Sequence, residues 1–126
     1  MTIREGDKVP PVTLRYLTPE GVRAVPSDEF FAGKKIVVFG LPGAYTRTCS
    51  SRHLPGYVGN AAALQAKGVD AIACVSVNDA FVMGAWGKEH GADGKVVMVG
   101  DGSAELTKAI GLELDRTGRP RYRIAR

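Results

Sequence analysis

Apolar runs of strand length alternate with helix-like segments along most of this sequence, and this alternation is its strongest constraint on the fold. Three runs are apolar nearly throughout, as in strands that are covered on both faces. They are KKIVVFGL (34–41), VDAIACVSV (69–77) and KVVMVGD (95–101). Short connections join them to segments of helical character. This pattern predicts an α/β sheet with right-handed crossovers.

Capping and stop residues set the bounds of the predicted helices. One covers 57–68, after an interruption at Pro55 and Gly56. A second covers 78–91, with Asn78 or Asp79 as its cap, and a third covers 103–114.

The N-terminal third carries weaker signals. PVTLRYL and GVRAV, separated by TPEG, predict an antiparallel hairpin. SDEFFAG predicts a short helical turn that Ser27 caps and Gly33 ends.

Length and charge exclude several classes of protein. With 126 residues the chain has room for one domain, and we assign residues 1–126 to it. No apolar run reaches the roughly 18 residues of a membrane span, and the charged N-terminus is not a secretory signal. We therefore expect a cytoplasmic protein.

The net charge of +4 comes from the tail 116–126, which holds five arginines, so specific nucleic-acid binding is not predicted.

Cys49 is the residue that most strongly suggests chemistry. It follows the strand-like run 34–41 in the stretch LPGAYTRTCSSRHLPGY, where a loop leads into a helix. Reactive groups collect at the carboxyl ends of strands in such folds. A helix N-terminus and the nearby Arg47 and Arg52 would lower the pKa of the thiol, and the thiolate is the nucleophilic form. Position alone leaves open that Cys49 is a small buried residue.

Two other residues could take part in chemistry. Cys74 lies within the predicted strand 69–77 and is best explained as an inert core thiol. It is 25 residues from Cys49, so the two do not form a CxxC pair. His53 lies four residues after Cys49, which leaves open a Cys–His hydrolase pair, although a structural role for His53 is favoured. Two cysteines are too few for a structural zinc site.

The stretch PGAYTRTCS resembles the peroxidatic motif of peroxiredoxins, with Pro42, Thr46 and Cys49 at the motif positions. The continuation RHLPGYV and the segment GVDAIACVSVNDAFVMGAWGKEHGADGKV resemble the peroxiredoxin-5 subfamily, also called type II or atypical. The resemblance runs from about Ile3 to Asp115. It implies a thioredoxin-like fold with an N-terminal hairpin extension.

The resemblance also implies an antioxidant enzyme that reduces hydrogen peroxide and alkyl hydroperoxides. Cys49 would attack the peroxide and become a sulfenic acid. Thr46 would hydrogen-bond the thiolate and the peroxide, Pro42 would shield the pocket, and no metal or organic cofactor is implied. A resolving cysteine has no counterpart, so glutathione, glutaredoxin or thioredoxin would restore Cys49. The subfamily further suggests a homodimer formed through the face around the active site.

The tail 116–126 departs from the family pattern. Relative to that pattern we expect the family's C-terminal strands to be missing, and YRIAR alternates in charge where an apolar strand is expected. Arg121 before Tyr122 fits locally as the arginine that completes the peroxide site. Either this is a shortened natural ending, or the tail comes from a frameshift or truncation, which we favour. The alternative to an enzyme is a degenerate, non-catalytic thioredoxin-fold redox sensor or interaction module.

Overall fold

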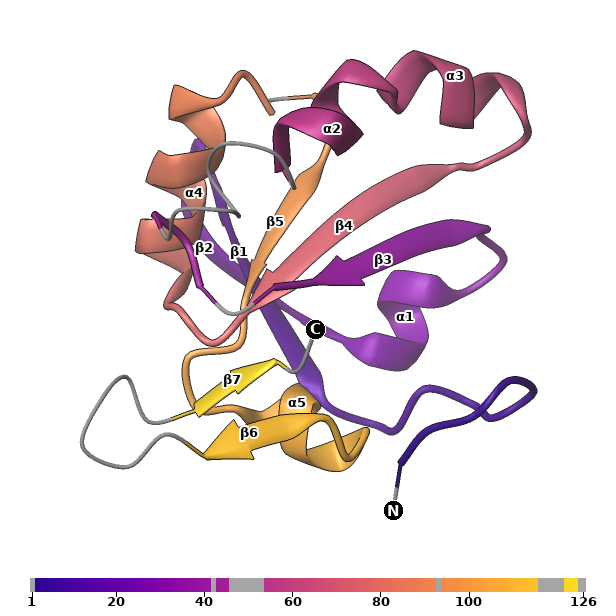
Figure 1. The fold of residues 1–126 in the computed structure, drawn as a ribbon, viewed down its shortest axis with the longest axis vertical. Helices are drawn as coiled ribbons and strands as arrows, with labels where there is room; N and C mark the ends of the chain where they lie inside the picture. Colours follow the sequence, from indigo (N-terminus) through magenta and orange to yellow (C-terminus); the bar gives the residue numbers. More distant parts are fainter. Residues whose placement is uncertain (1, 42, 46–53, 93, 116–121, 125–126) are drawn as a thin grey trace.

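The computed structural model describes residues 2–41, 43–45, 54–92, 94–115 and 122–124. Figure 1 shows helices on both sides of a central twisted sheet. In chain order the elements are β1 (Thr13–Thr18), β2 (Gly21–Pro26), α1 (Ser27–Phe31), β3 (Ile36–Gly40), α2 (Leu54–Gly59), α3 (Ala61–Ala66), β4 (Ala71–Ser76), α4 (Ala80–Glu89), β5 (Val97–Gly100), α5 (Glu105–Ala109), β6 (Glu113–Asp115) and β7 (Tyr122–Ile124).

The central sheet has the strand order β2-β1-β5-β4-β3. The neighbours β3, β4 and β5 are parallel, whereas β1 runs antiparallel to both β2 and β5. The predicted α/β sheet and the predicted N-terminal hairpin are therefore confirmed. The hairpin joins the sheet at β5, so that β3 is left as the edge strand on the opposite side.

Side-chain alternation along the strands creates two apolar clusters, one on each face of the sheet. On β4, Ile72 and Cys74 belong to the first cluster and Ala73 and Val75 to the second. The first cluster lies under α2, α3 and α4, and its face is called the α4 face below. It consists of Phe39, Leu41, Ala44, Leu54, Ala61, Ile72, Cys74, Met83, Trp86, Ala92, Val96 and Met98.

The second cluster lies under α1 and α5, and its face is called the α5 face. Its buried members are Leu14, Ala73, Val75, Val99 and Leu106. Phe30 and Phe31 of α1 pack against it and meet edge to face, with ring centroids 5.0 Å apart. This cluster is smaller than the first.

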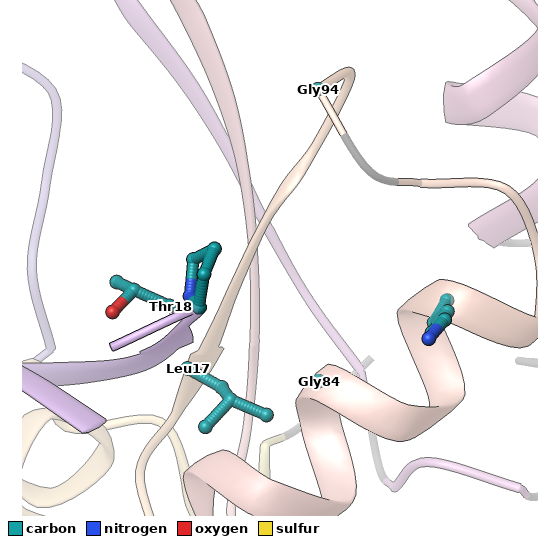
Figure 2. A pocket seen from close by; sticks show the side chains of 6 residues that line it. Leu17, Thr18, Gly84 and Gly94 are labelled. Atoms are coloured by element: carbon teal, nitrogen blue, oxygen red, sulfur yellow. The ribbon is translucent and has the colours of Figure 1, made fainter. Parts of the chain in front are cut away.

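Helix α4 packs closely on the sheet because it presents glycines to it. A Cβ atom on Gly84 would lie 2.7 Å from Cδ2 of Leu17, a separation that real Cβ atoms do not tolerate. Figure 2 shows the Leu17 side chain extending from β1 toward Gly84 of α4, at the wall of a hollow of about 490 Å³. The hollow is lined by Leu17, Thr18, Pro19, Gly84, Lys88 and Gly94.

Two predictions about local structure in the first two thirds of the chain were wrong. Ser27 does not cap α1: its hydroxyl donates to the Pro10 carbonyl (2.8 Å) and accepts from the Val12 N–H (3.1 Å), which ties the chain before β1 to α1.

Pro55 and Gly56 do not interrupt a helix but lie inside α2. The interruption comes at Asn60, whose side-chain amide competes with the helix by donating to the Gly56 carbonyl (2.7 Å).

The predicted helix 103–114 is too long. Helix α5 ends at Ala109 and is followed by Gly111, whose φ of 75° is a left-handed conformation that ends helices. The chain then forms β6, which pairs with β7 as a separate antiparallel sheet. The stretch around Tyr122, which was not expected to form a strand, is therefore β7.

Candidate functional site

The candidate site lies where the chain leaves β3 at the carboxyl end of the parallel strands. The N–H of Leu41 donates to the Val75 carbonyl (3.1 Å), so the pairing with β4 continues one residue beyond β3. A turn at Ala44 and Tyr45 follows, and the described chain resumes at Leu54 in α2. Parallel sheets bind ligands at this edge.

Most of the predicted reactive residues fall outside the described part of the chain. These are Pro42, Thr46, Arg47, Cys49, Arg52, His53 and Arg121. Their roles stay predictions. The structure does describe the residues on either side of the segment 46–53. These residues and the side chains that hold them are called the frame of the site below.

The first part of this frame is Asn78, which joins the loop after β3 to the loop after β4. Its side-chain oxygen accepts the N–H of Ala44 (2.9 Å) and the hydroxyl of Ser76 (2.9 Å). Sequence reasoning considered Asn78 only as a helix cap. The cap of α4 is Asp79, which accepts the N–H of Val82 (2.8 Å). Asn78 is thus free to hold the loop.

The second part is Tyr45, which sequence reasoning did not single out. Its φ of 61° is in the left-handed region, which is uncommon for a bulky residue. Its hydroxyl donates to Oε1 of Glu89 at the end of α4 (3.0 Å). Desolvation, the hydrogen bond to Glu89 and the charge of Glu89, in that order, raise the pKa of Tyr45 above its ordinary value of 10.0. A phenol with the ordinary pKa is already protonated at neutral pH, so Tyr45 can act as the donor.

The ring of Tyr45 lies next to the ring of Trp86. Its ring centroid lies 6.4 Å from that of Trp86, and Trp86 in turn meets His90 edge to face at 5.6 Å. Trp86 is fully buried in the first cluster. The exposed hydroxyl of Tyr45 is therefore attached to a ring that rests on the core.

Both ends of the segment 46–53 are anchored to the same apolar core. Leu41 and Ala44 enter the first cluster from the β3 side, and Leu54 enters it from α2. The ring of Tyr57 stacks on Phe39 with a centroid distance of 3.9 Å and an interplanar angle of 5°, which ties α2 to β3. The first cluster is called the apolar floor below.

Cys74 lies in this floor, as predicted. It is 0% exposed in the middle of β4, with Phe39 and Met98 as its neighbours on the adjacent strands. A thiol enclosed in this way is not accessible to peroxides or to other proteins.

The described residues contain no group of three or more histidine, cysteine, aspartate or glutamate side chains that could hold a metal ion. In the same part of the chain, no helix has the length and apolar character needed to cross a membrane.

Comparison with known proteins identifies the family. The model of the Redoxin family matches residues 4–126. Peroxiredoxin-2D of Arabidopsis thaliana is 47% identical over 114 residues, which cover 90% of this chain and 70% of that protein. The chain belongs to the peroxiredoxins, a family of thiol peroxidase enzymes.

Solved peroxiredoxin structures agree with the architecture described above. Reduced Prx3 of Vibrio vulnificus, in complex with hydrogen peroxide, matches with a TM-score of 0.94 and 52% identity over 98% of this chain and 77% of that one. Peroxiredoxin 5 from Alvinella pompejana matches with a TM-score of 0.85 and 33% identity over 97% of this chain and 78% of that one. The prediction of a thioredoxin-like fold is confirmed.

Two further relatives correct one prediction and limit another. Peroxiredoxin-2E-2, chloroplastic, of Oryza sativa is 52% identical and Peroxiredoxin-2E, chloroplastic, of Arabidopsis thaliana is 48% identical, each over 94% of this chain. Both are chloroplast proteins, so the cytoplasmic location inferred from the N-terminus was wrong. The chain spans about half the length of these two relatives, 54% and 52%.

Proposed function

We propose that this chain is a thiol-dependent peroxidase that reduces hydrogen peroxide and alkyl hydroperoxides, with Cys49 as the peroxidatic residue. The observation that carries the proposal is the 52% identity to Vibrio vulnificus Prx3, which binds hydrogen peroxide, over nearly the whole chain. The frame formed by Asn78, Tyr45 and the apolar floor supports it. This frame fixes both ends of the segment that contains Cys49.

The reaction we propose begins with the Cys49 thiolate. The sulfur attacks the terminal peroxide oxygen, an S–O bond forms and the O–O bond breaks. The departing alkoxide or hydroxide takes one proton and leaves as an alcohol or water, and Cys49 becomes a sulfenic acid. One reductant thiol then forms a mixed disulfide with release of water. A second thiol displaces Cys49 from that disulfide and restores the thiolate.

Thr46, Pro42 and Arg121 complete the proposed site. Thr46 hydrogen-bonds the thiolate and the peroxide, and Pro42 shields them from water. Arg121 stabilises the charge that develops on the leaving oxygen, so Arg121→Gln should slow the oxidation of Cys49 by about 100-fold or more. An unchanged oxidation rate in Arg121→Gln would remove Arg121 from the site.

We place the chain in the peroxiredoxin-5 (type II) subfamily and propose that residues 1–126 act as one redoxin domain. Glutathione with glutaredoxin, or thioredoxin, would supply the electrons. The likeness to Alvinella pompejana peroxiredoxin 5 supports the subfamily. Turnover measured with each reductant in turn identifies the partner.

We also propose a homodimer through the face around the site. Two aromatic side chains are exposed there, Tyr45 (51%) and Phe81 (64%), the latter on α4. Aromatic side chains are enriched at protein–protein interfaces relative to the rest of the surface. Phe81→Ser should shift the mass measured by light scattering from dimer to monomer, and a monomeric wild type would overturn the dimer.

The peroxidase is tested by rapid mixing with hydrogen peroxide while the free thiol is followed. We expect fast loss of one thiol in the wild type and in Cys74→Ala, and no fast phase in Cys49→Ala. Cys74→Ala is the matched control because it removes the buried thiol and leaves Cys49 in place. Oxidation of Cys49 at the rate of free cysteine would favour the non-catalytic sensor or interaction module.

A further inference from the structure

We infer that the hydrogen bond between Tyr45 and Glu89 is a latch that positions the loop carrying Cys49. Tyr45 and Glu89 are positioning residues in this inference, which rests on the proposed peroxidase function. Neither side chain has to touch the peroxide. Their effect reaches the reacting cysteine through the direction in which the chain leaves Tyr45.

The backbone at Tyr45 shows why a latch is needed. A φ of 61° is unfavourable for a residue with a large side chain, and such a conformation persists only where the surroundings impose it. The hydroxyl of Tyr45 reaches Oε1 of Glu89 at 3.0 Å, and its ring rests on Trp86. These two contacts hold the ring and the hydroxyl of one side chain and together oppose a return to an extended backbone.

The latch works together with the Asn78 contact on the preceding residue. The N–H of Ala44 is held by Asn78, which immediately precedes the cap of α4, whereas the Tyr45 side chain is held by Glu89 at the other end of α4. Helix α4 (Ala80–Glu89) therefore spans the distance between the two fixed points. Because α4 is packed on the sheet through Gly84 and Gly87, it provides a rigid support for both.

The peptide bond between Tyr45 and Thr46 connects the latch to the proposed site. Thr46 is bonded to Tyr45, so the φ and ψ angles of Tyr45 determine how the segment with Thr46 and Cys49 begins. Reactions between aligned groups are sensitive to small displacements, because the reacting atoms must approach at a defined distance and angle. Loss of the latch should therefore reduce the rate of peroxide attack without unfolding the protein.

Three variants test the latch in the full chain. Tyr45→Phe removes the donor, Glu89→Ala removes the acceptor, and Glu89→Gln keeps an acceptor oxygen while removing the charge. Two matched controls remove the same groups elsewhere: Tyr16→Phe on β1 and Glu20→Gln at the exposed turn between β1 and β2. The measurements are the second-order rate of Cys49 oxidation by hydrogen peroxide, the unfolding midpoint and the amide exchange of residues 43–45.

We expect Tyr45→Phe and Glu89→Ala each to lower the oxidation rate about two- to tenfold, as the loss of one hydrogen bond implies. The double variant should be no slower than either single variant, since both remove the same interaction. Glu89→Gln should keep more than half of the wild-type rate. The exchange of residues 43–45 should be faster in the first two variants, with unfolding midpoints close to that of the wild type and both controls unchanged.

The outcomes separate the latch from the peroxidase. If the wild type reacts rapidly and Tyr45→Phe reacts equally fast, the latch is wrong and the peroxidase stands. If the wild type reacts no faster than free cysteine, the peroxidase is wrong, and unchanged amide exchange in Tyr45→Phe then overturns the latch as well. Rates that fall additively in the double variant also contradict it.

Discussion

The two faces of the sheet differ in how completely they are filled. On the α4 face, Leu41, Leu54 and Trp86 are fully buried. On the α5 face, Val38 of β3 is 45% exposed, and a groove of about 390 Å³ runs over β3 and β4 toward α5. Val38 and Val75 line this groove together with Leu106. The tightly packed face is the one that holds Leu41, Ala44 and Leu54, the described residues on either side of the segment 46–53. Rigid packing is what the proposed site would require.

Of the variants that compare the packing of the two faces, Trp86→Ala should have the largest effect on the free energy of unfolding. Removing a fully buried tryptophan leaves a cavity in the first cluster and should lower the free energy of unfolding by about 3–5 kcal/mol. Phe31→Ala on the α5 face is the matched aromatic truncation. Its half-exposed ring should cost only about 1–2 kcal/mol. Chemical denaturation measures both, and equal losses would mean that the two faces are packed alike.

The next effect comes from Asn78→Ala, which leaves the N–H of Ala44 and the hydroxyl of Ser76 without their acceptor. We expect a loss of about 1–3 kcal/mol in the free energy of unfolding, together with slower oxidation of Cys49. Asp79→Ala is the control, because it removes the neighbouring cap of α4 without touching the loop. The role of Asn78 in the loop would be refuted by equal slowing in both variants.

A smaller effect is expected on the open α5 face. Val38→Ser should change the free energy of unfolding by less than about 0.5 kcal/mol, because this side chain is already in contact with water. Val75→Ser, in the same groove but 3% exposed, should cost far more, since it buries an additional hydroxyl. Comparable losses for the two variants would mean that the groove is covered in solution.

The smallest effect concerns pH. The pKa of Tyr45 is higher in the folded protein than the ordinary tyrosine pKa of 10.0. The stabilisation from its hydrogen bond to Glu89 is therefore fully present below pH 10.0. It is lost as the pH rises through the higher pKa of the folded state. Absorbance titration of the phenols should show a late step above the ordinary tyrosine pKa of 10.0. That late step should move to lower pH in Glu89→Gln and should vanish in Tyr45→Phe. A late step that persists in Tyr45→Phe belongs to another tyrosine.

Sequence reasoning was most successful where the signal is local. The apolar runs 34–41, 69–77 and 95–101 contain β3, β4 and β5, and Gly91 ends α4 as expected. It failed where a side chain bonds outside its own element. Ser27 looks like a helix cap in sequence but binds Pro10 and Val12, and Asn78 looks like a cap but holds Ala44.

The alternation of strands and helices from β3 to α5, the burial of Cys74 and the family motif around Cys49 follow from the sequence by itself, because hydrophobic periodicity and short motifs are properties of neighbouring residues. The frame of the site was decided only by the tertiary structure. Ala44 meets Asn78 across 34 residues, and Tyr45 meets Glu89 across 44. No periodicity in the chain encodes such contacts. They exist because the parallel pairing of β3 with β4 brings the loops after these two strands to one edge of the sheet, and because α4, which begins after the second loop, packs on β1 and β5.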